Sequence, residues 1–434
     1  MRDGPSESTA MLESLRGNVR KFYVYRLFMG LSAYVWIPIS LLYFVDRGIS
    51  ITQFMVLWSL FSISVLVFEI PTGVLADRIS RKWSLVAGVT LTVCALVVFL
   101  SSSSFPLLAV GYLIFGLGHA LTSGADLALL YDSLKIAGRE DSFRRVIGTA
   151  LTWQLSGQVV GPLIIGVVVG IGGLSWTLVA GLVFNLVAAP VAASLVDPPT
   201  FAVAGPPEAS IRSKLGGNLH HLKSSLGIVV RNRQLLAIVV IGIVIFDFTE
   251  LTKRPFVQPY LVAFGFSAGQ IGYLYSLFVA AAAVVAKFSH RLDEAFGSDE
   301  RKVMTITLAV AIGGLLALAN ATVTWVAVAA VFVMFSLDWG LREPVIQTSL
   351  NRRVPSEYRA ACLSIVNMTF SFVTIFTGPL FGFLVDEYSL RTGLSIFQFT
   401  FGPLLLAAVI LAWLTLRPVA NGGLGVNRPR IGGA

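Results

Sequence analysis

The chain has 434 residues, of which 56% are hydrophobic and only 13% are charged, and its mean hydropathy is +0.80. Soluble proteins carry roughly a quarter charged residues, so this composition excludes a water-soluble globular fold and indicates an integral membrane protein. The net charge of +9 does not indicate nucleic-acid binding, because the basic residues recur in short clusters between apolar runs rather than in one patch.

Twelve apolar runs are long enough to cross a bilayer as helices. In chain order they cover residues 22–44, 50–76, 83–101, 106–134, 144–170, 174–196, 235–262, 268–290, 302–320, 323–350, 358–385 and 391–416. The fold class is therefore predicted to be all-α, with twelve transmembrane helices in two bundles of six, residues 22–196 and 234–416. Residues 197–233 are predicted to form a cytoplasmic linker, and residues 1–21 and 417–434 cytoplasmic tails.

The basic residues outside these runs are distributed unequally between the two sides. When the N-terminus is assigned to the cytoplasm, nearly all of them fall on the cytoplasmic side, and the opposite side keeps only Arg47 and Arg391. Loops rich in lysine and arginine stay in the cytoplasm. The asymmetry predicts a multi-pass protein of the cell membrane with both termini cytoplasmic.

The turn between the second and third runs reads Gly73-Val-Leu-Ala-Asp77-Arg78-Ile-Ser-Arg81-Lys82. Its bases hold the loop in the cytoplasm, and its acid can face the positive end of a neighbouring helix. The spacing resembles the pattern G-x-L-A-D-R-x-G-R-K between the second and third helices of the major facilitator superfamily, with Ser80 in place of a glycine. The resemblance covers essentially the whole chain. It implies a gating loop in which Asp77 faces the start of the eleventh helix in the outward-open state.

The fifth run carries a glycine pattern formed by Gly148, Gly157, Gly161, Pro162 and Gly166. Small residues four positions apart let another helix approach closely, and a proline bends the helix. The pattern resembles G-x8-G-x3-G-P-x2-G-G of the 12-helix drug:proton antiporter branch, with Ile165 replacing one glycine. The resemblance implies export rather than uptake. The alternative is an ordinary glycine-rich packing helix.

Two short patterns recur 217 positions apart. Gly48-Ile-Ser50-Ile-Thr-Gln53 returns as Gly265-Phe-Ser267-Ala-Gly-Gln270, and Gly161-Pro162-Leu163 returns as Gly378-Pro379-Leu380. We therefore expect two parallel repeats, with a binding site between them near the middle of the membrane.

Ionisable residues inside the predicted helices are costly in lipid and indicate a function by default. Four acids are candidates for proton coupling: Glu69, Asp126, Asp247 and Asp338. A rise of about 1.5 Å per residue places Arg26, Glu69 and Asp126 at similar depth, where they are expected to form one network. The alternative is that such acids form neutral pairs that only join helices, which we favour for Glu250 and Glu343.

Further residues are expected to line the cavity where cargo binds. They are Arg26, Tyr34, Trp36, His119, Trp153, Glu250, Arg254, Trp339 and Arg342. An aromatic cavity with a few acids suits amphipathic or cationic molecules, whereas Lys253 and Arg254 suit an anion. The charge of the cargo stays open at this point.

The predicted function is proton-driven efflux of small amphipathic compounds, with a small-molecule substrate, protons and the bilayer as partners. Uptake by proton symport or facilitated diffusion is one alternative, and a non-transporting receptor or scaffold is another. The sequence contains no P-loop, metal-ligand spacing or nucleophile motif, so neither an enzyme nor a cofactor or metal is expected. Resemblance to the family implies a monomer.

Overall fold

The computed structural model describes residues 5–198, 224–252, 256–296, 299–337, 340, 343–354 and 358–416. Within these ranges the regular secondary structure is entirely helical. In the described part of the chain, eleven helical spans are long and apolar enough to cross a membrane, and a shorter apolar helix, Thr324–Ser336, lies in the tenth predicted run. The predicted all-α, multi-span fold is confirmed.

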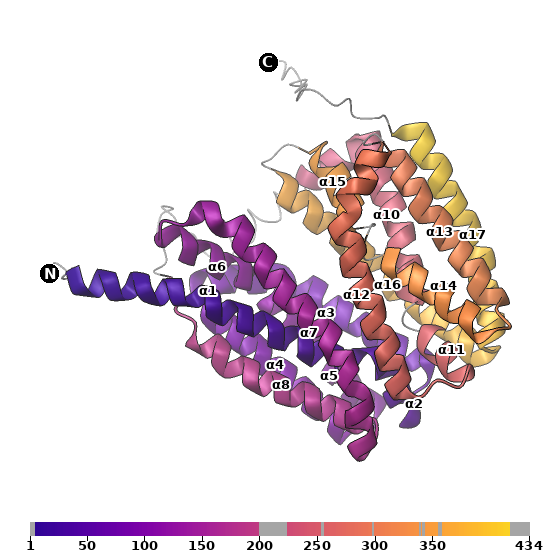
Figure 1. The fold of residues 1–434 in the computed structure, drawn as a ribbon, viewed down its shortest axis with the longest axis horizontal. Coiled ribbons are helices and arrows are strands. Elements are labelled where there is room, and N and C mark those ends of the chain that lie inside the picture. Colours follow the sequence, from indigo (N-terminus) through magenta and orange to yellow (C-terminus); the bar gives the residue numbers. More distant parts are fainter. Residues whose placement is uncertain are drawn as a thin grey trace.

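The helices form two bundles (Figure 1). The N-terminal bundle contains α1 (Pro5–Tyr34), η1 (Ile37–Ile39), α2 (Ser40–Asp46), α3 (Ile51–Arg78), α4 (Arg81–Ser101), α5 (Phe105–Thr122), α6 (Ala125–Ile136), η2 (Glu140–Ser142), α7 (Phe143–Gly172) and α8 (Ser175–Ser194). The C-terminal bundle contains α10 (Arg233–Leu251), α11 (Val257–Ala263), α12 (Ala268–Ala295), α13 (Glu300–Asn320), α14 (Thr324–Leu337), α15 (Glu343–Asn351), α16 (Arg359–Glu387) and α17 (Leu390–Thr415).

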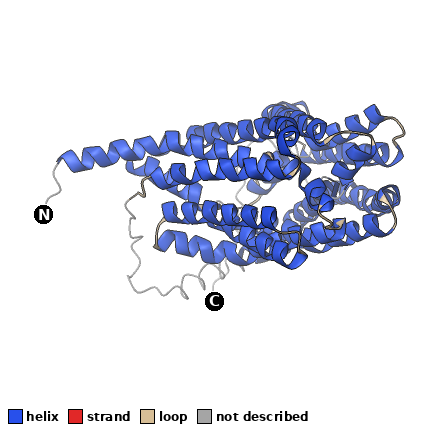
Figure 2. Cartoon of the chain, turned by 90° about the horizontal axis from the view of Figure 1, so that it is seen from below, coloured by secondary structure: helices blue, strands red, loops and turns tan. Residues whose placement is uncertain are grey.

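Two predicted helices are broken within residues that the structure describes without a gap. The first divides into α1, η1 and α2 around Pro38, which has no backbone N–H to continue the helix. The fourth divides into α5 and α6 at Gly124, whose φ of +77° lies in the left-handed region that favours glycine. In addition, α1 begins at Pro5, so most of the expected N-terminal tail is a helix that projects beyond the bundle (Figure 2).

The two repeats agree in local geometry. Gly48 and Gly265 both have a φ of +85°. Each turn is followed by the same reciprocal cap: Gln53 N donates to Ser50 Oγ (3.2 Å) while Ser50 N donates to Gln53 Oε1 (3.0 Å). Ser267 and Gln270 repeat both bonds at 3.3 and 2.8 Å. The internal repeat predicted from the sequence is therefore present in the structure.

The bundles meet at one end and separate toward the other. We call the separated end, where Arg81, Arg233 and Arg353 lie, the base-rich end, and the opposite end the base-poor end. At the base-poor end α3 packs against α16 and α7 against α12. Figure 1 shows α2 and α11 close together there, whereas α6 and α15 lie apart at the base-rich end.

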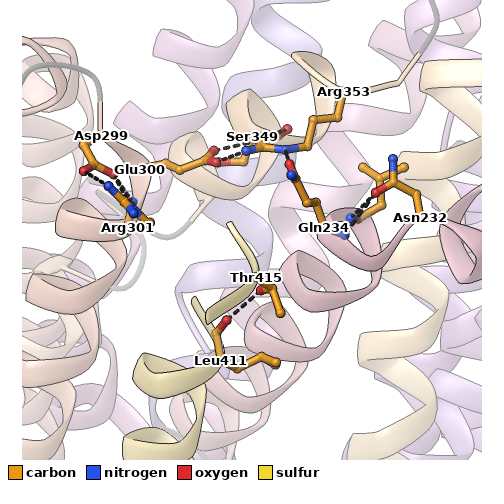
Figure 3. A network of polar contacts seen from close by, with 10 residues as sticks. Asn232, Gln234, Asp299, Glu300, Arg301, Ser349, Arg353, Leu411 and Thr415 are labelled. Atoms are coloured by element: carbon orange, nitrogen blue, oxygen red, sulfur yellow. Dashed lines mark hydrogen bonds and ion pairs between the residues drawn. The ribbon is translucent and has the colours of Figure 1, made fainter. Parts of the chain in front are cut away.

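A polar network joins the base-rich ends of α10, α13 and α15 (Figure 3). Just beyond α15, Arg353 forms a buried ion pair with Glu300, with an Nη1–Oε2 distance of 2.8 Å, and donates from Nε to Gln234 Oε1 (2.9 Å). Next to it, Asp299 caps α13 by accepting from Arg301 N (3.1 Å) and also binds the Arg301 guanidinium (2.7 Å). This hydrogen-bonded ion pair lowers the pKa of the Asp299 carboxyl below its usual value.

Candidate functional site

A cavity of about 550 Å³ lies between the two bundles. Most of its lining comes from the N-terminal bundle, and Glu250, Gln258, Tyr275 and Phe335 contribute from the C-terminal bundle. The walls combine aromatic rings with amide, hydroxyl and charged groups. This volume and mixture suit a small organic molecule.

The α7–α12 contact closes one side of the cavity toward the base-poor end. A Cβ added to Gly269 would stand 2.8 Å from Gly166 Cα, so the two helices touch through backbone. A Cβ on Gly272 would stand 2.5 Å from Pro162 O. Nearby, Ser276 Oγ donates to Val159 O (2.7 Å).

The α3–α16 contact closes the other side. Ser59, which is 217 positions before Ser276, donates from Oγ to Ile375 O (2.8 Å). At the outer end of this contact Asp386 accepts three bonds from the start of α3: from Ile51 N (3.1 Å), Thr52 N (2.7 Å) and Thr52 Oγ1 (2.6 Å). Here a carboxylate from one bundle caps a helix N-terminus of the other.

A further bond joins the bundles between these two contacts. Leu41 N donates to Gln258 Oε1 (3.1 Å), and these residues are themselves 217 positions apart. The inter-bundle hydrogen bonds described above, all between described residues, lie toward the base-poor end. The cavity therefore opens toward the base-rich end.

An ion pair lies in the cavity wall. Arg26 Nη2 is 2.8 Å from Asp126 Oδ2, and Arg26 Nη1 donates to Gln154 Oε1 (2.8 Å). The break at Gly124 places Asp126 in the first turn of α6, where its carboxylate accepts from Leu127 N (2.6 Å) and faces the positive end of the helix. The side chains of the pair are 15% and 10% exposed.

Only part of the expected network forms. Arg26 and Asp126 are together, but the Glu69 carboxylate makes no hydrogen bond or ion pair with any described residue. Glu69 is half-buried on α3 and does not line the central cavity.

Three other predicted cavity residues, Tyr34, His119 and Glu250, do line the cavity. The His119 ring is exposed to it and lies beside Phe61, with ring centroids 5.6 Å apart. Sequence analysis missed the amides Gln154, Gln158 and Gln258 in the lining. Glutamine within an apolar helix is the signal that would have found them.

Two predicted aromatic residues lie elsewhere. Trp36 is 1% exposed and packs against Phe99 and Phe115 inside the N-terminal bundle. The helical register is lost after Tyr34, so the side chains that follow do not continue the cavity face of α1. Trp153 is 44% exposed on α7, where Gln154 and Gln158 occupy the cavity face instead.

Asp247 also lies outside the central cavity lining. It is 3% exposed, and its Oδ1 accepts from Thr374 Oγ1 (3.1 Å) and Thr377 Oγ1 (2.7 Å) of α16. The remaining predicted residues Arg254, Asp338, Trp339 and Arg342 lie outside the described residues.

The gating loop is folded onto its own bundle. Asp77 Oδ1 accepts from Arg81 Nη2 (3.0 Å), and Arg81 pairs in turn with Asp132 of α6. Asp77 is bonded to no described residue of α16, so the contact expected for the outward-open state is not made here. Ser80, the residue that departs from the family pattern, is the N-cap of α4, because its Oγ accepts a hydrogen bond from Trp83 N (3.0 Å).

The other members of this loop make fewer contacts. A Cβ on Gly73 would meet no atom within 4 Å. Lys82 lies 5.3 Å from the Trp83 ring centroid, and its backbone N–H donates to Asp197 Oδ1 (3.3 Å). Arg78 ends α3, and its side chain lies outside the described part of the chain.

The glycines of α7 differ in what surrounds them. A Cβ on Gly157 would stand 2.4 Å from Leu27 O, and one on Gly161 would stand 3.0 Å from Tyr34 C, so both are needed where α7 packs on α1. Gly148 has open space around it. Ile165, the departure from the exporter pattern, is fully buried, and the small partner at that point is Gly272 of α12.

Comparison with known sequences gives two matches. A family profile described as Major Facilitator Superfamily matches residues 22–340 and 254–430. A curated Bacillus subtilis (strain 168) protein, "Uncharacterized MFS-type transporter YxaM", is 22% identical over 375 residues, which cover 85% of this chain and 90% of that protein.

Solved structures share the fold. The nucleoside transporter NupG superposes with a TM-score of 0.71 at 16% identity, covering 92% of this chain and 98% of that one. A POT family transporter in complex with 5-aminolevulinic acid superposes with a TM-score of 0.73 at 11% identity, covering 93% and 97%. At such identities the likeness concerns the fold and not the cargo.

Proposed function

The chain belongs to the Major Facilitator Superfamily, and from that premise we propose that it exports small amphipathic compounds from the cytoplasm in exchange for protons. Membership makes it a multi-pass secondary transporter and not an enzyme. Direction, cargo and coupling are the parts that we propose.

The first support concerns orientation. Loops rich in arginine and lysine remain in the cytoplasm, so we assign the base-rich end to that side. With this assignment the cavity is open to the cytoplasm and closed to the outside by the α3–α16 and α7–α12 contacts. This conformation is the one in which an exporter takes up its cargo.

The observation that carries the proposal of export is the packing of α7. Gly157 and Gly161 bring α7 against α1, and Gly166 brings it against α12, so one helix closes both an intra-bundle and an inter-bundle contact. These glycines are the ones that resemble the antiporter pattern. Because Gly272 accommodates Ile165, the one departure from the pattern leaves the close approach intact.

Coupling is assigned to the Arg26–Asp126 pair. An ion pair requires an ionised carboxylate, so the pair corresponds to the state after a proton has left Asp126. When Asp126 takes up a proton, it loses its charge attraction to Arg26, and the lining of the cavity changes. Cargo and proton then alternate at one place, which is what antiport requires.

The test is transport in proteoliposomes with an imposed pH gradient, scanning cationic, neutral and anionic amphiphiles. Protons run toward the alkaline side, so an antiporter accumulates its cargo on the acidic side. Accumulation on the alkaline side would instead establish proton symport, and equilibration without accumulation would establish facilitated diffusion. No movement of any compound would favour a receptor or scaffold.

The variant Asp126→Asn tests the coupling residue. We expect it to exchange cargo down a gradient but not to concentrate cargo, because the amide cannot carry the proton. A variant that still concentrates cargo would overturn the assignment. Asn substitutions of Asp247 and Asp338, and Gln substitution of Glu69, would then identify the acid responsible.

A further inference from the structure

A second hollow opens on the outer face of the C-terminal bundle. This lateral crevice has a volume of about 370 Å³ and is lined by α10, α16 and α17. Its walls are mostly aliphatic and aromatic, and Leu380, Thr400 and Leu404 at its edge are exposed. Because α17 lies on the outer side of the bundle, the crevice faces the region that lipid occupies (Figure 1).

One carboxylate lies at the floor of this crevice. Asp247 is 3% exposed, and the Thr374 and Thr377 hydroxyls both lie within hydrogen-bond distance of its Oδ1. Its Oδ2 makes no hydrogen bond or ion pair with any residue that the structure describes. A carboxylate in apolar surroundings needs a proton or a cation to neutralise it.

The repeat shows that this arrangement is particular to the C-terminal bundle. The positions 217 residues before Asp247 and Thr374 are Gly30 and Gly157. In the N-terminal bundle these glycines let α1 and α7 touch, since a Cβ on Gly30 would stand 2.3 Å from the carbonyl oxygen of Gln154. In the C-terminal bundle larger polar side chains take both positions, and α10 and α16 meet there through the Asp247–Thr374 hydrogen bond instead of backbone to backbone.

The crevice lies next to the central cavity. Thr374, which hydrogen-bonds Asp247, also lines a chamber of about 130 Å³ between α3, α10 and α16. Trp58, Phe61 and Glu250 line both this chamber and the central cavity. The Asp247–Thr374 hydrogen bond therefore lies between the lateral crevice and the site already described.

We propose that the crevice is a membrane-side binding site for a cationic amphiphile, with the ammonium head at Asp247 and the apolar body along Leu380 and Leu404. Charge complementarity with a buried carboxylate selects the cation, and the aliphatic walls select the chain. The site gives cargo dissolved in the bilayer a place to bind beside the central cavity. This inference rests on the proposed export of amphipathic compounds.

The test is photolabelling of the full chain in proteoliposomes with a primary alkylamine that carries a diazirine in its chain. The amine is expected to label residues 373–384 of α16 or 396–404 of α17. Loss of a charge-assisted hydrogen bond should reduce this labelling about tenfold in Asp247→Asn. Glu387→Gln, which removes an exposed carboxylate at the end of α16, should leave it unchanged.

A second variant and a second probe complete the experiment. Leu404→Trp fills the mouth of the crevice while keeping the carboxylate, so it should also reduce labelling. This variant tests the site even if Asp247→Asn fails to fold. The alcohol of the same chain length should label weakly. Equal labelling by amine and alcohol, or no effect of either variant, would overturn the proposal. Labelling confined to the central cavity would also overturn it, while leaving proton-coupled export intact.

Discussion

The two contacts that join the bundles begin alike and end differently. Both contain a serine bond, from Ser59 in one and from Ser276 in the other. Both contacts also pack backbone against backbone at a glycine: α7 and α12 meet through Gly166 and Gly269, and a Cβ on Gly382 of α16 would stand 2.9 Å from Thr52 Cα of α3. The α3–α16 contact differs in that the Asp386 carboxylate also caps the start of α3. The residue at the position equivalent to Asp386 is Val169, so the repeat has diverged here.

This difference divides the roles of the two contacts. Backbone packing through glycines depends on shape and is lost when any side chain is added. Hydrogen bonds to a carboxylate at the surface exchange readily with water, so the part of the α3–α16 contact that Asp386 supplies can be lost at a smaller cost than the glycine packing. We expect the glycine packing in both contacts to decide whether the base-poor end can close, and the Asp386 hydrogen bonds to decide how often it does.

The largest effect is expected for Gly269→Leu. The added side chain would meet the Gly166 backbone at a distance that neither helix can relieve without moving apart. Overpacking of this kind costs about 1–3 kcal/mol, so transport should fall by about ten- to a hundredfold. Spin-label distances across the base-poor end should lengthen. Gly148→Leu, on α7 in open space, is the matched control and should transport normally.

A smaller effect is expected for Asp386→Asn. The amide keeps one acceptor oxygen for α3 but loses the charge and the second acceptor, which amounts to about 1–2 kcal/mol. The spin-label distance distribution should shift toward the open base-poor end while maximal transport changes by less than in Gly269→Leu. The adjacent Glu387→Gln gives the baseline. Equal shifts in both variants would show that Asp386 does not hold the contact.

The two serine bonds allow a direct comparison of the contacts. Ser59→Ala and Ser276→Ala each remove one hydrogen bond worth about 1 kcal/mol. If the contacts differ as described, Ser59→Ala opens the base-poor end further than Ser276→Ala, because the outer end of the α3–α16 contact then depends in part on the Asp386 hydrogen bonds, which exchange with water. Cysteine cross-linking rates across each contact measure this. Identical rates in the two variants would remove the distinction.

The smallest effect on opening is expected for Asp299→Ala, far from both contacts. Loss of the cap of α13 should lower the free energy of unfolding by about 1 kcal/mol without changing distances across the base-poor end. Because the pKa of Asp299 is lowered in the folded state, its stabilisation is present at neutral pH. It should be lost progressively as the pH falls from about 4, the ordinary pKa of an aspartate, through the lowered pKa of the folded state. Thermal unfolding in detergent at several pH values measures both.

The hydrophobic runs and the internal repeat were enough to predict the fold, because both are regular patterns that can be recognised in a single sequence. Arg26 and Asp126 were correctly expected to meet, since depth along a helix follows from counting residues. The direction in which a side chain points does not follow from depth. Asp247 has the depth of a cavity residue but faces α16, and Trp36 follows a helix break that Pro38 only suggests. The cavity amides were missed because neutral polar residues give no charge signal.

The bond between Leu41 and Gln258 joins equivalent positions of the two repeats. In a symmetric pair of identical half-length proteins, a residue at such a point would face a copy of itself, and two glutamines or two leucines would have to share the space. Joining both halves in one polypeptide lets each copy change alone, so one can present a backbone donor and the other a side-chain acceptor. Fusion of the halves therefore lets one copy of this position carry an apolar side chain while the other supplies the amide oxygen that binds its backbone N–H.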